Sequence, residues 1–147
     1  MKLIAELNEN KQAYLLGYIS CSQLKKPQKI NFYLDSGCTV TTLLDIDVVR
    51  LGLNWRNLKQ TTCDTAAGKA FPFVLPQVTI LLKSFEDGKV WLNPFTLEEI
   101  HLLPPEDPTQ IVPVQYEFAF SLLGMDVLAN FSSWKFDYKN KKVILET

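Results

Sequence analysis

The chain has few of the residues on which metal sites depend. Its 147 residues include 3 cysteines and 1 histidine. Cys21, Cys38 and Cys63 form no Cys-x-x-Cys pair, and only His101 could supplement them as a ligand. Three cysteines also cannot all pair with one another, which suits a reducing compartment. The composition therefore disfavours a zinc site.

The chain also lacks a charge bias of either sign. Its 15 Lys and Arg residues nearly cancel its 16 Asp and Glu residues. No basic cluster exceeds Lys25-Lys26 or Lys141-Lys142, so the sequence offers no evident surface for a phosphate backbone. We therefore expect no nucleic-acid partner.

Long apolar runs are missing as well. No apolar stretch approaches the length that spans a membrane. The apolar residues at the start of the chain meet Glu6, Glu9 and Lys11 before they can build the core of a signal peptide. We expect no membrane partner and a cytoplasmic location. With no repeat or linker visible, residues 1–147 are expected to form a single domain.

Short apolar stretches separated by frequent turn residues predict a mostly β chain with a barrel-like fold. Short helices are expected at residues 45–51, which have acidic residues in the first turn and Gly52 beyond the end, and at 125–130. Prolines at 104, 105, 108 and 113 predict an irregular loop. Four hairpins are expected. The first joins residues 3–7 to 13–20, and the second consists of two strands within residues 58–82 around Gly68. The third turns at Asp87-Gly88 between Phe85 and Val90, and the last joins residues 136–138 to 143–145.

An Asp-Ser-Gly triplet stands at the end of one strand-like run. Within residues 30–34 apolar side chains alternate with Asn31 and Tyr33, the period-two pattern of a half-buried strand. Asp35, Ser36 and Gly37 follow directly. Such a triplet arises by chance in roughly one chain of this length in fifteen, so its position at a strand end carries most of the information. The pattern presents Asp35 as a candidate catalytic carboxylate.

A second segment, Phe-Ser-Leu-Leu-Gly-Met-Asp-Val-Leu at 120–128, has an apolar strand end, a glycine and the start of a helix. With the triplet it resembles the retropepsin-like aspartic proteases, the single-domain relatives of retroviral proteases. That family has D-[ST]-G after one strand, two hydrophobic residues and a glycine after a later one, and a glycine-tipped hairpin, the flap, between them. The matching residues here are Asp35-Ser36-Gly37, Leu122-Leu123-Gly124 and, for the flap, Ala66, Ala67, Gly68 and Lys69.

The resemblance implies a retropepsin-like, single-lobe β-barrel with one or two short helices, and an aspartic endopeptidase without metal or organic cofactor. Hydrolysis by this route needs two carboxylates that share one proton. One chain has one triplet, so the second carboxylate must be Asp35 of another copy at a two-fold axis. The expected partners are therefore a second copy and a polypeptide substrate. Gly37 is expected to donate its N–H to the carboxylate, and Ser36 to bond across the dimer.

Alternatives to this interpretation remain. Cys38 stands where Ala is common in the family and could be a nucleophile, but no histidine lies near it in the sequence and small buried cysteines are common. Asp64 begins a near copy of the triplet that lacks the glycine, so it is expected to be a surface acid, and Asp126 is expected to cap a helix. The competing hypothesis is a catalytically inactive retropepsin-like module for dimerisation or peptide binding, and a monomeric β-barrel binder is a more distant one.

Overall fold

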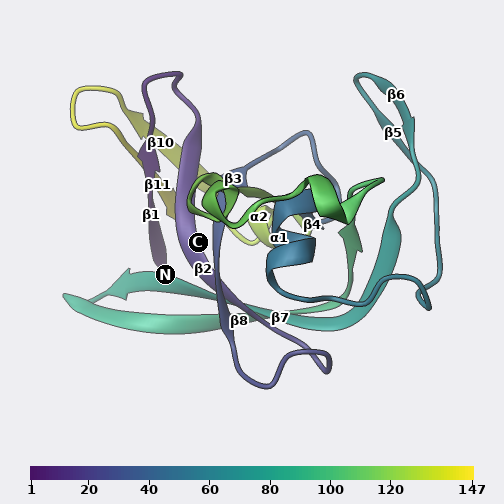
Figure 1. The fold of residues 1–147 in the computed structure, drawn as a ribbon. Coiled ribbons are helices and arrows are strands. Elements are labelled where there is room, and N and C mark those ends of the chain that lie inside the picture. Colours follow the sequence, from purple (N-terminus) through teal and green to yellow (C-terminus); the bar gives the residue numbers. More distant parts are fainter.

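The computed structural model describes residues 1–147 and is built mainly from strands (Figure 1). Two short α-helices and two 3-10 helices interrupt them. The strands are β1 (Lys2–Leu7), β2 (Ala13–Ser20), β3 (Gln28–Leu34), β4 (Thr42–Leu43), β5 (Cys63–Thr65), β6 (Gly68–Ala70), β7 (Phe73–Glu86), β8 (Lys89–Leu102), β9 (Ser121–Leu123), β10 (Ser133–Asp137) and β11 (Lys142–Glu146). The helices are α1 (Asp45–Arg50), α2 (Met125–Leu128), and the 3-10 helices η1 (Pro108–Gln110) and η2 (Pro113–Phe118).

Nine strands form one sheet in the order β10-β11-β1-β2-β3-β9-β4-β8-β7, and β7 also pairs with β1 and β2. These extra pairings close the sheet on itself, so the predicted mostly β, barrel-like architecture is confirmed. In Figure 1 the long β7–β8 hairpin runs beneath the body, while β10, β11, β1 and β2 stand together at one side. No helix has the length and apolar character needed to cross a membrane.

The interior of the closed sheet is one hydrophobic cluster of 22 buried residues. The alternation predicted for the strand before Asp35 places Ile30 and Phe32 in this cluster, at 1% and 0% exposure. Helix α1 adds Val48 and helix α2 adds Val127, both fully buried. Because each such side chain contributes about 1.5–3 kcal/mol on burial, the two helices are held to the sheet mainly by apolar contact.

Most of the predicted turns and helices are found where the sequence places them. The hairpins β1–β2 and β10–β11 are antiparallel as expected. Asp87 and Gly88 join β7 to β8 with φ values of 49° and 72°, the backbone form that two-residue hairpin turns favour. Helix α1 agrees with the prediction, and α2 ends at Leu128, before the expected end at 130. The proline-rich segment, predicted to be an irregular loop, contains the 3-10 helices η1 and η2.

The prediction of two strands within residues 58–82 needs correction. The turn at Gly68 joins the short strands β5 and β6, which form a separate two-stranded sheet, and the long strand β7 begins only at Phe73. Beyond β5 and β6 the two segments of the hairpin pair again: Thr61 N donates to the carbonyl of Pro72 at 2.9 Å, and Val74 N donates to the carbonyl of Lys59 at 2.8 Å. Pro72 has no N–H to donate, so the ladder is divided at this position.

Candidate active site

Asp35 lies directly after β3, and the sheet topology brings it beside the second predicted segment. β9 pairs in parallel with β3, with Leu34 opposite Leu123. The N–H of Asp35 donates to the carbonyl of Leu123 at 3.0 Å. In the sheet order β9 lies between β3 and β4, so the chain after Asp35 must cross the end of β9 before it re-enters the sheet. The two segments are therefore neighbours despite their separation in the sequence.

The Asp35-Ser36-Gly37 triplet forms a tight turn that orients the carboxylate. The N–H of Gly37 donates to Oδ1 of Asp35 at 2.9 Å, which confirms the predicted hydrogen bond. The N–H of Cys38 donates to the Asp35 carbonyl at 3.1 Å. Asp35 is half-buried, whereas Ser36 and Gly37 are exposed. No hydrogen bond within the chain reaches Oδ2 of Asp35, so one carboxylate oxygen is fixed and the other is free.

Gly124 is where the two segments touch most closely. A Cβ atom placed on it would lie 2.8 Å from both Thr41 N and Val40 C, and 2.9 Å from the Cys38 carbonyl oxygen. The N–H of Met125 donates to that same carbonyl at 2.8 Å. The element at 122–124 therefore packs behind the Asp35 loop, and glycine is needed for this approach.

Thr41 and Asp126 form a second link between the loop and α2. The carboxylate of Asp126 accepts hydrogen bonds from Thr41 N at 2.8 Å and from Thr41 Oγ1 at 2.6 Å. Thr41 Oγ1 in turn accepts from the N–H of Gly124 at 3.0 Å. The prediction that Asp126 caps the helix is wrong: the N-cap of α2 is Gly124, and Asp126 lies within the first turn, where its Oδ1 accepts from Val127 N at 3.0 Å. Its partner Thr41 was missed, because nothing in the local pattern links two residues so far apart in the chain.

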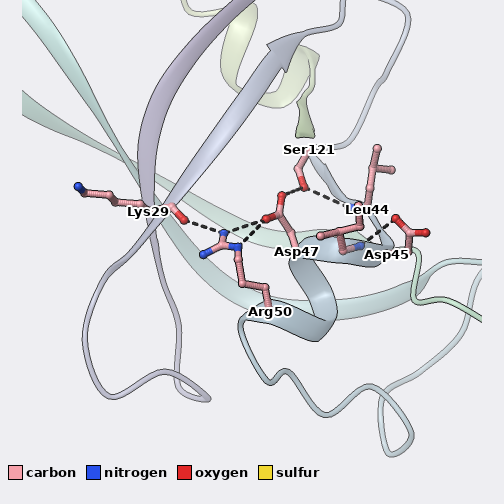
Figure 2. A network of polar contacts seen from close by, with 7 residues as sticks. Lys29, Leu44, Asp45, Asp47, Arg50 and Ser121 are labelled. Carbon is pink, nitrogen blue, oxygen red and sulfur yellow. Dashed lines mark hydrogen bonds and ion pairs between the residues drawn. The ribbon is translucent and has the colours of Figure 1, made fainter. Parts of the chain in front are cut away.

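An ion pair between the buried Asp47 and the half-buried Arg50 links the strands that carry the site (Figure 2). Asp47 is 1% exposed, and its Oδ1 accepts hydrogen bonds from Arg50 Nη2 at 2.8 Å and Nε at 3.0 Å. Its Oδ2 accepts from Ser121 Oγ of β9 at 2.6 Å. Arg50 Nη2 also donates to the carbonyl of Lys29 in β3 at 2.8 Å. Because both charges are paired and hydrogen-bonded, the network ties α1 to β3 and β9 without leaving a buried charge unpaired.

Asp35 borders an open hollow of about 420 Å³. Asp35 is the only acidic residue among those that line it, and most of the lining is apolar or aromatic. A single chain therefore provides one carboxylate in a partly apolar recess. The other lining residues are Lys11, Gln12, Ala13, Tyr33, Leu34, Ser36, Leu122, Trp134 and Phe136.

The candidate flap is the β5–β6 hairpin, which stands away from the body in Figure 1. Gly68 has φ = 120°, a conformation that L side chains rarely adopt. Thr65 Oγ1 donates to the Gly68 carbonyl at 2.7 Å and steadies the turn. Ala66, Ala67 and Lys69 are exposed, and no flap residue lines the hollow beside Asp35. Asp64 is an exposed acid, as predicted.

The structure does not place Cys38 as a nucleophile. Its thiol donates to the Val40 carbonyl at 2.9 Å, and no hydrogen bond joins it to His101. Burial raises the pKa of the Cys38 thiol, and the carboxylates of Asp35 and Asp126 raise it further, although a hydrogen bond with Thr42 acts in the opposite direction. A thiol with a raised pKa stays protonated at neutral pH, and the thiol is the weak nucleophile of the two forms. His101 lies in β8, a strand position as predicted.

Comparisons with known proteins agree with this geometry at the level of the fold. No protein-family model matches the chain, and no curated protein sequence matches it. Among solved structures, a retropepsin-like aspartic protease from Rickettsia conorii is similar, with a TM-score of 0.58 and 23% identity, over 99% of this chain and 89% of that one. The EIAV protease complexed with the inhibitor HBY-793 is similar with a TM-score of 0.47 and 19% identity, over 84% of this chain and 90% of that one. The chain has a retropepsin-like fold.

Proposed function

We propose that the protein is an aspartic endopeptidase whose active site is formed by Asp35 from two copies of the chain. The observation that carries the proposal is the state of the Asp35 carboxylate: Oδ1 is held by the Gly37 N–H, Oδ2 is free, and no other acid lines the hollow. A second Asp35 across a two-fold axis supplies the missing carboxylate. The likeness of the fold to a retropepsin-like aspartic protease over nearly the whole chain supports the same assignment.

The reaction follows from two adjacent carboxyl groups, of which one is ionised and one protonated. The ionised group takes a proton from a water molecule, whose oxygen attacks the carbonyl carbon of the peptide bond. The protonated group gives its proton to the carbonyl oxygen, so a neutral tetrahedral intermediate forms. The carboxyl group that took the proton from water then transfers it to the amide nitrogen, and the other carboxylate takes a proton from a hydroxyl of the intermediate. The C–N bond breaks and releases an amine and a carboxylic acid. No metal or organic cofactor is required.

The residues around Asp35 have separate tasks in this mechanism. The Gly37 N–H fixes the plane of the carboxylate, and Ser36, exposed at the same turn, is placed to bond across the dimer. The apolar side chains of the hollow favour a substrate with apolar residues around the cleaved bond. The flap binds this substrate as an extended strand when it closes.

Two further observations support a single-domain enzyme located in the cytoplasm. Buried side chains from Leu3 near one end of the chain to Leu145 near the other form one hydrophobic cluster, which supports a single domain. Cys21, Cys38 and Cys63 are all free thiols, which suits the reducing environment of the cytoplasm.

Subunit mixing tests the proposal directly. Equal amounts of wild-type and Asp35→Asn chains should lower the activity per wild-type chain to about one half, and a nine-fold excess to about one tenth, because random pairing traps wild-type chains in mixed dimers. The measurement is cleavage of an unfolded polypeptide at fixed wild-type concentration, with exchange verified by co-purification of differently tagged chains. Asp64→Asn chains, which change an exposed flap acid instead, should add activity. If mixed dimers form and activity per wild-type chain is unchanged, the shared site is excluded, and absence of cleavage by the wild-type dimer leaves the inactive binding module as the better description.

Replacing Gly68 by Val should reduce turnover by about ten-fold while shifting the thermal unfolding midpoint by less than a few degrees. A β-branched residue at φ = 120° is strained, but no atom of the protein lies within 4 Å of the added Cβ, so the strain falls on the hairpin and not on the core. Steady-state kinetics and thermal unfolding measure the two effects. Ala67→Val, at the neighbouring exposed position, is the matched control and should remain close to wild type. Equal kinetics for the two variants would remove the flap assignment.

A further inference from the structure

We propose that the hollow beside the C-terminal end of α1 is a second binding site, which takes an acidic segment of a polypeptide. In this site Arg56 and Asn57 bind the carboxylate of an Asp or Glu side chain, and Trp55 packs against the apolar or aromatic residue next to it. The inference goes beyond the proposed function, because no residue that lines this hollow also lines the one beside Asp35.

The hollow has an apolar lining that is continuous with the core. Its volume is about 460 Å³, slightly larger than that of the hollow beside Asp35. Val48 and Leu53, which are 0% and 3% exposed, lie in its wall together with Pro108. Trp55 is partly buried and packs against the hydrophobic cluster. A ligand can therefore bury apolar surface here against side chains that are already held in place.

Hydrogen bonds fix the loop that forms the polar side of the hollow. Asn54 N donates to Gln23 Oε1 at 2.8 Å, and Gln23 Nε2 donates to the Asn54 carbonyl at 3.0 Å. Arg56 N donates to Asn54 Oδ1 at 3.2 Å, and Leu58 N donates to the Trp55 carbonyl at 3.0 Å. Because the backbone is fixed before a ligand binds, binding loses little affinity to the ordering of this loop.

Arg56 gives the hollow an uncompensated positive charge. It is the only charged residue of the lining, and its guanidinium lies over the Trp55 ring, 4.7 Å from the ring centroid. None of the four ion pairs of the chain includes Arg56. Asp107, the acid next to Pro108 in the chain, instead accepts hydrogen bonds from Thr109 N at 3.0 Å and Thr109 Oγ1 at 2.7 Å. Stacking on the indole leaves the N–H groups at the edge of the guanidinium available to an anion.

The free donors of the hollow match a carboxylate better than a phosphate group. A guanidinium binds a carboxylate through two parallel N–H···O bonds. The side chain of Asn57, which also lines the hollow, has no hydrogen-bond partner within the chain and adds a further donor. A phosphate group carries nearly two negative charges at neutral pH and is typically bound opposite several arginines, whereas this lining has one cation.

The shape of the hollow favours a polypeptide over a small organic acid. Sites for small molecules enclose most of the ligand surface. This hollow is open, so an acidic side chain and its neighbour can enter while the rest of the polypeptide stays in solvent. The ligand class is therefore a polypeptide segment in which an acidic residue is next to an apolar or aromatic one.

Titration with a blocked peptide tests the inference. The probe is acetyl-Ala-Glu-Phe-Ala-amide, whose only charge is the Glu carboxylate, and the protein is the Asp35→Asn chain, so that cleavage does not remove the probe. We expect the largest changes in backbone amide NMR shifts within residues 48–57. Replacing Glu by Gln in the peptide should weaken binding about ten-fold, because a charge-assisted hydrogen bond is lost.

Variants of the loop assign the effect to particular side chains. Arg56→Gln should weaken binding of the Glu peptide about ten-fold and remove its advantage over the Gln peptide. Asn57→Asp places a negative charge in the hollow, so it should weaken binding of the Glu peptide and leave that of the Gln peptide nearly unchanged. Lys59→Gln removes an exposed charge that does not line the hollow, and as the matched control it should keep both affinities. All three positions are exposed, and thermal unfolding verifies that each variant folds.

Several results would overturn the inference. They are the absence of binding, shifts confined to the residues that line the hollow beside Asp35, equal affinity for the two peptides, and a preference for Glu that persists in Arg56→Gln or disappears in Lys59→Gln. Inorganic phosphate and phenylacetate are titrated in the same way and should bind more weakly than the Glu peptide. Tighter binding of phosphate would make the hollow a phosphate site, and tighter binding of phenylacetate would make it a site for small organic acids.

The outcome is independent of the proposed function. Every titration uses a chain without the Asp35 carboxylate, so binding of the Glu peptide supports the second site even if the wild type cleaves no polypeptide. An active endopeptidase whose Asp35→Asn form ignores the Glu peptide would retain the proposed function and remove the second site.

Discussion

Asp35→Asn is expected to lower the rate of cleavage of an unfolded polypeptide by at least about 10³-fold, the scale on which a positioned general base acts. The thermal unfolding midpoint should stay close to that of wild type. Asn has nearly the same shape as Asp, and its amide oxygen can still accept the Gly37 N–H that now binds Oδ1 at 2.9 Å. The substitution therefore removes the charge and the proton chemistry and keeps the turn.

Two controls make this result specific to Asp35. Asp64→Asn changes the acid of the triplet-like sequence in β5, which is exposed, and should leave cleavage unchanged. Cys38→Ala removes the thiol nearest the candidate carboxylate and should keep most of the activity if the thiol only packs against Val40 and Thr42. Undiminished cleavage by Asp35→Asn, or a complete loss of cleavage in a normally folded Cys38→Ala, would contradict the assignment of Asp35 as the catalytic residue.

The local part of the site was predictable because it depends on short-range patterns. Alternation over residues 30–34 identified a half-buried strand, and the structure places Asp35 directly after β3. The positions of Gly52 and of Asp87-Gly88 identified a helix end and a hairpin turn, and all three residues have positive φ. In these places one or two residues determine the backbone conformation.

The long-range part of the site could not be read in the same way. Asp47 and Asp126 looked like ordinary first-turn acids of short helices, yet Asp47 binds Ser121 and Asp126 binds Thr41 across the fold. These contacts depend on the parallel pairing of β3 with β9, which no local pattern specifies. The separation of β6 from β7 also depends on a long-range effect, because Pro72 has no N–H to donate to the opposite segment at Thr61.

Gly124→Ala is expected to cause the largest loss of stability, about 3 kcal/mol in the free energy of unfolding, which is the upper end of the usual cost of small-to-large changes in tightly packed sites. Its backbone has φ = -90° and ψ = -179°, which any residue adopts, so the whole effect is steric. The new Cβ would lie 2.8 Å from the backbone atoms Thr41 N and Val40 C. These atoms are held in place, since Gly124 N donates to Thr41 Oγ1 at 3.0 Å and Met125 N to the Cys38 carbonyl at 2.8 Å.

Urea unfolding measures this loss, and Gly52→Ala is the matched control. Gly52 has φ = 66° with no atom within 4 Å of an added Cβ, so its substitution reports backbone strain without a clash and should cost only about 1–2 kcal/mol. Gly124→Ala should also reduce cleavage by the protein that remains folded, because relief of the clash must move the loop that holds Asp35. Equal stability losses in the two variants, with full activity in Gly124→Ala, would contradict the prediction. They would mean that the backbone at Thr41 leaves more room than the 2.8 Å expected for an added Cβ, and that this contact does not position the carboxylate.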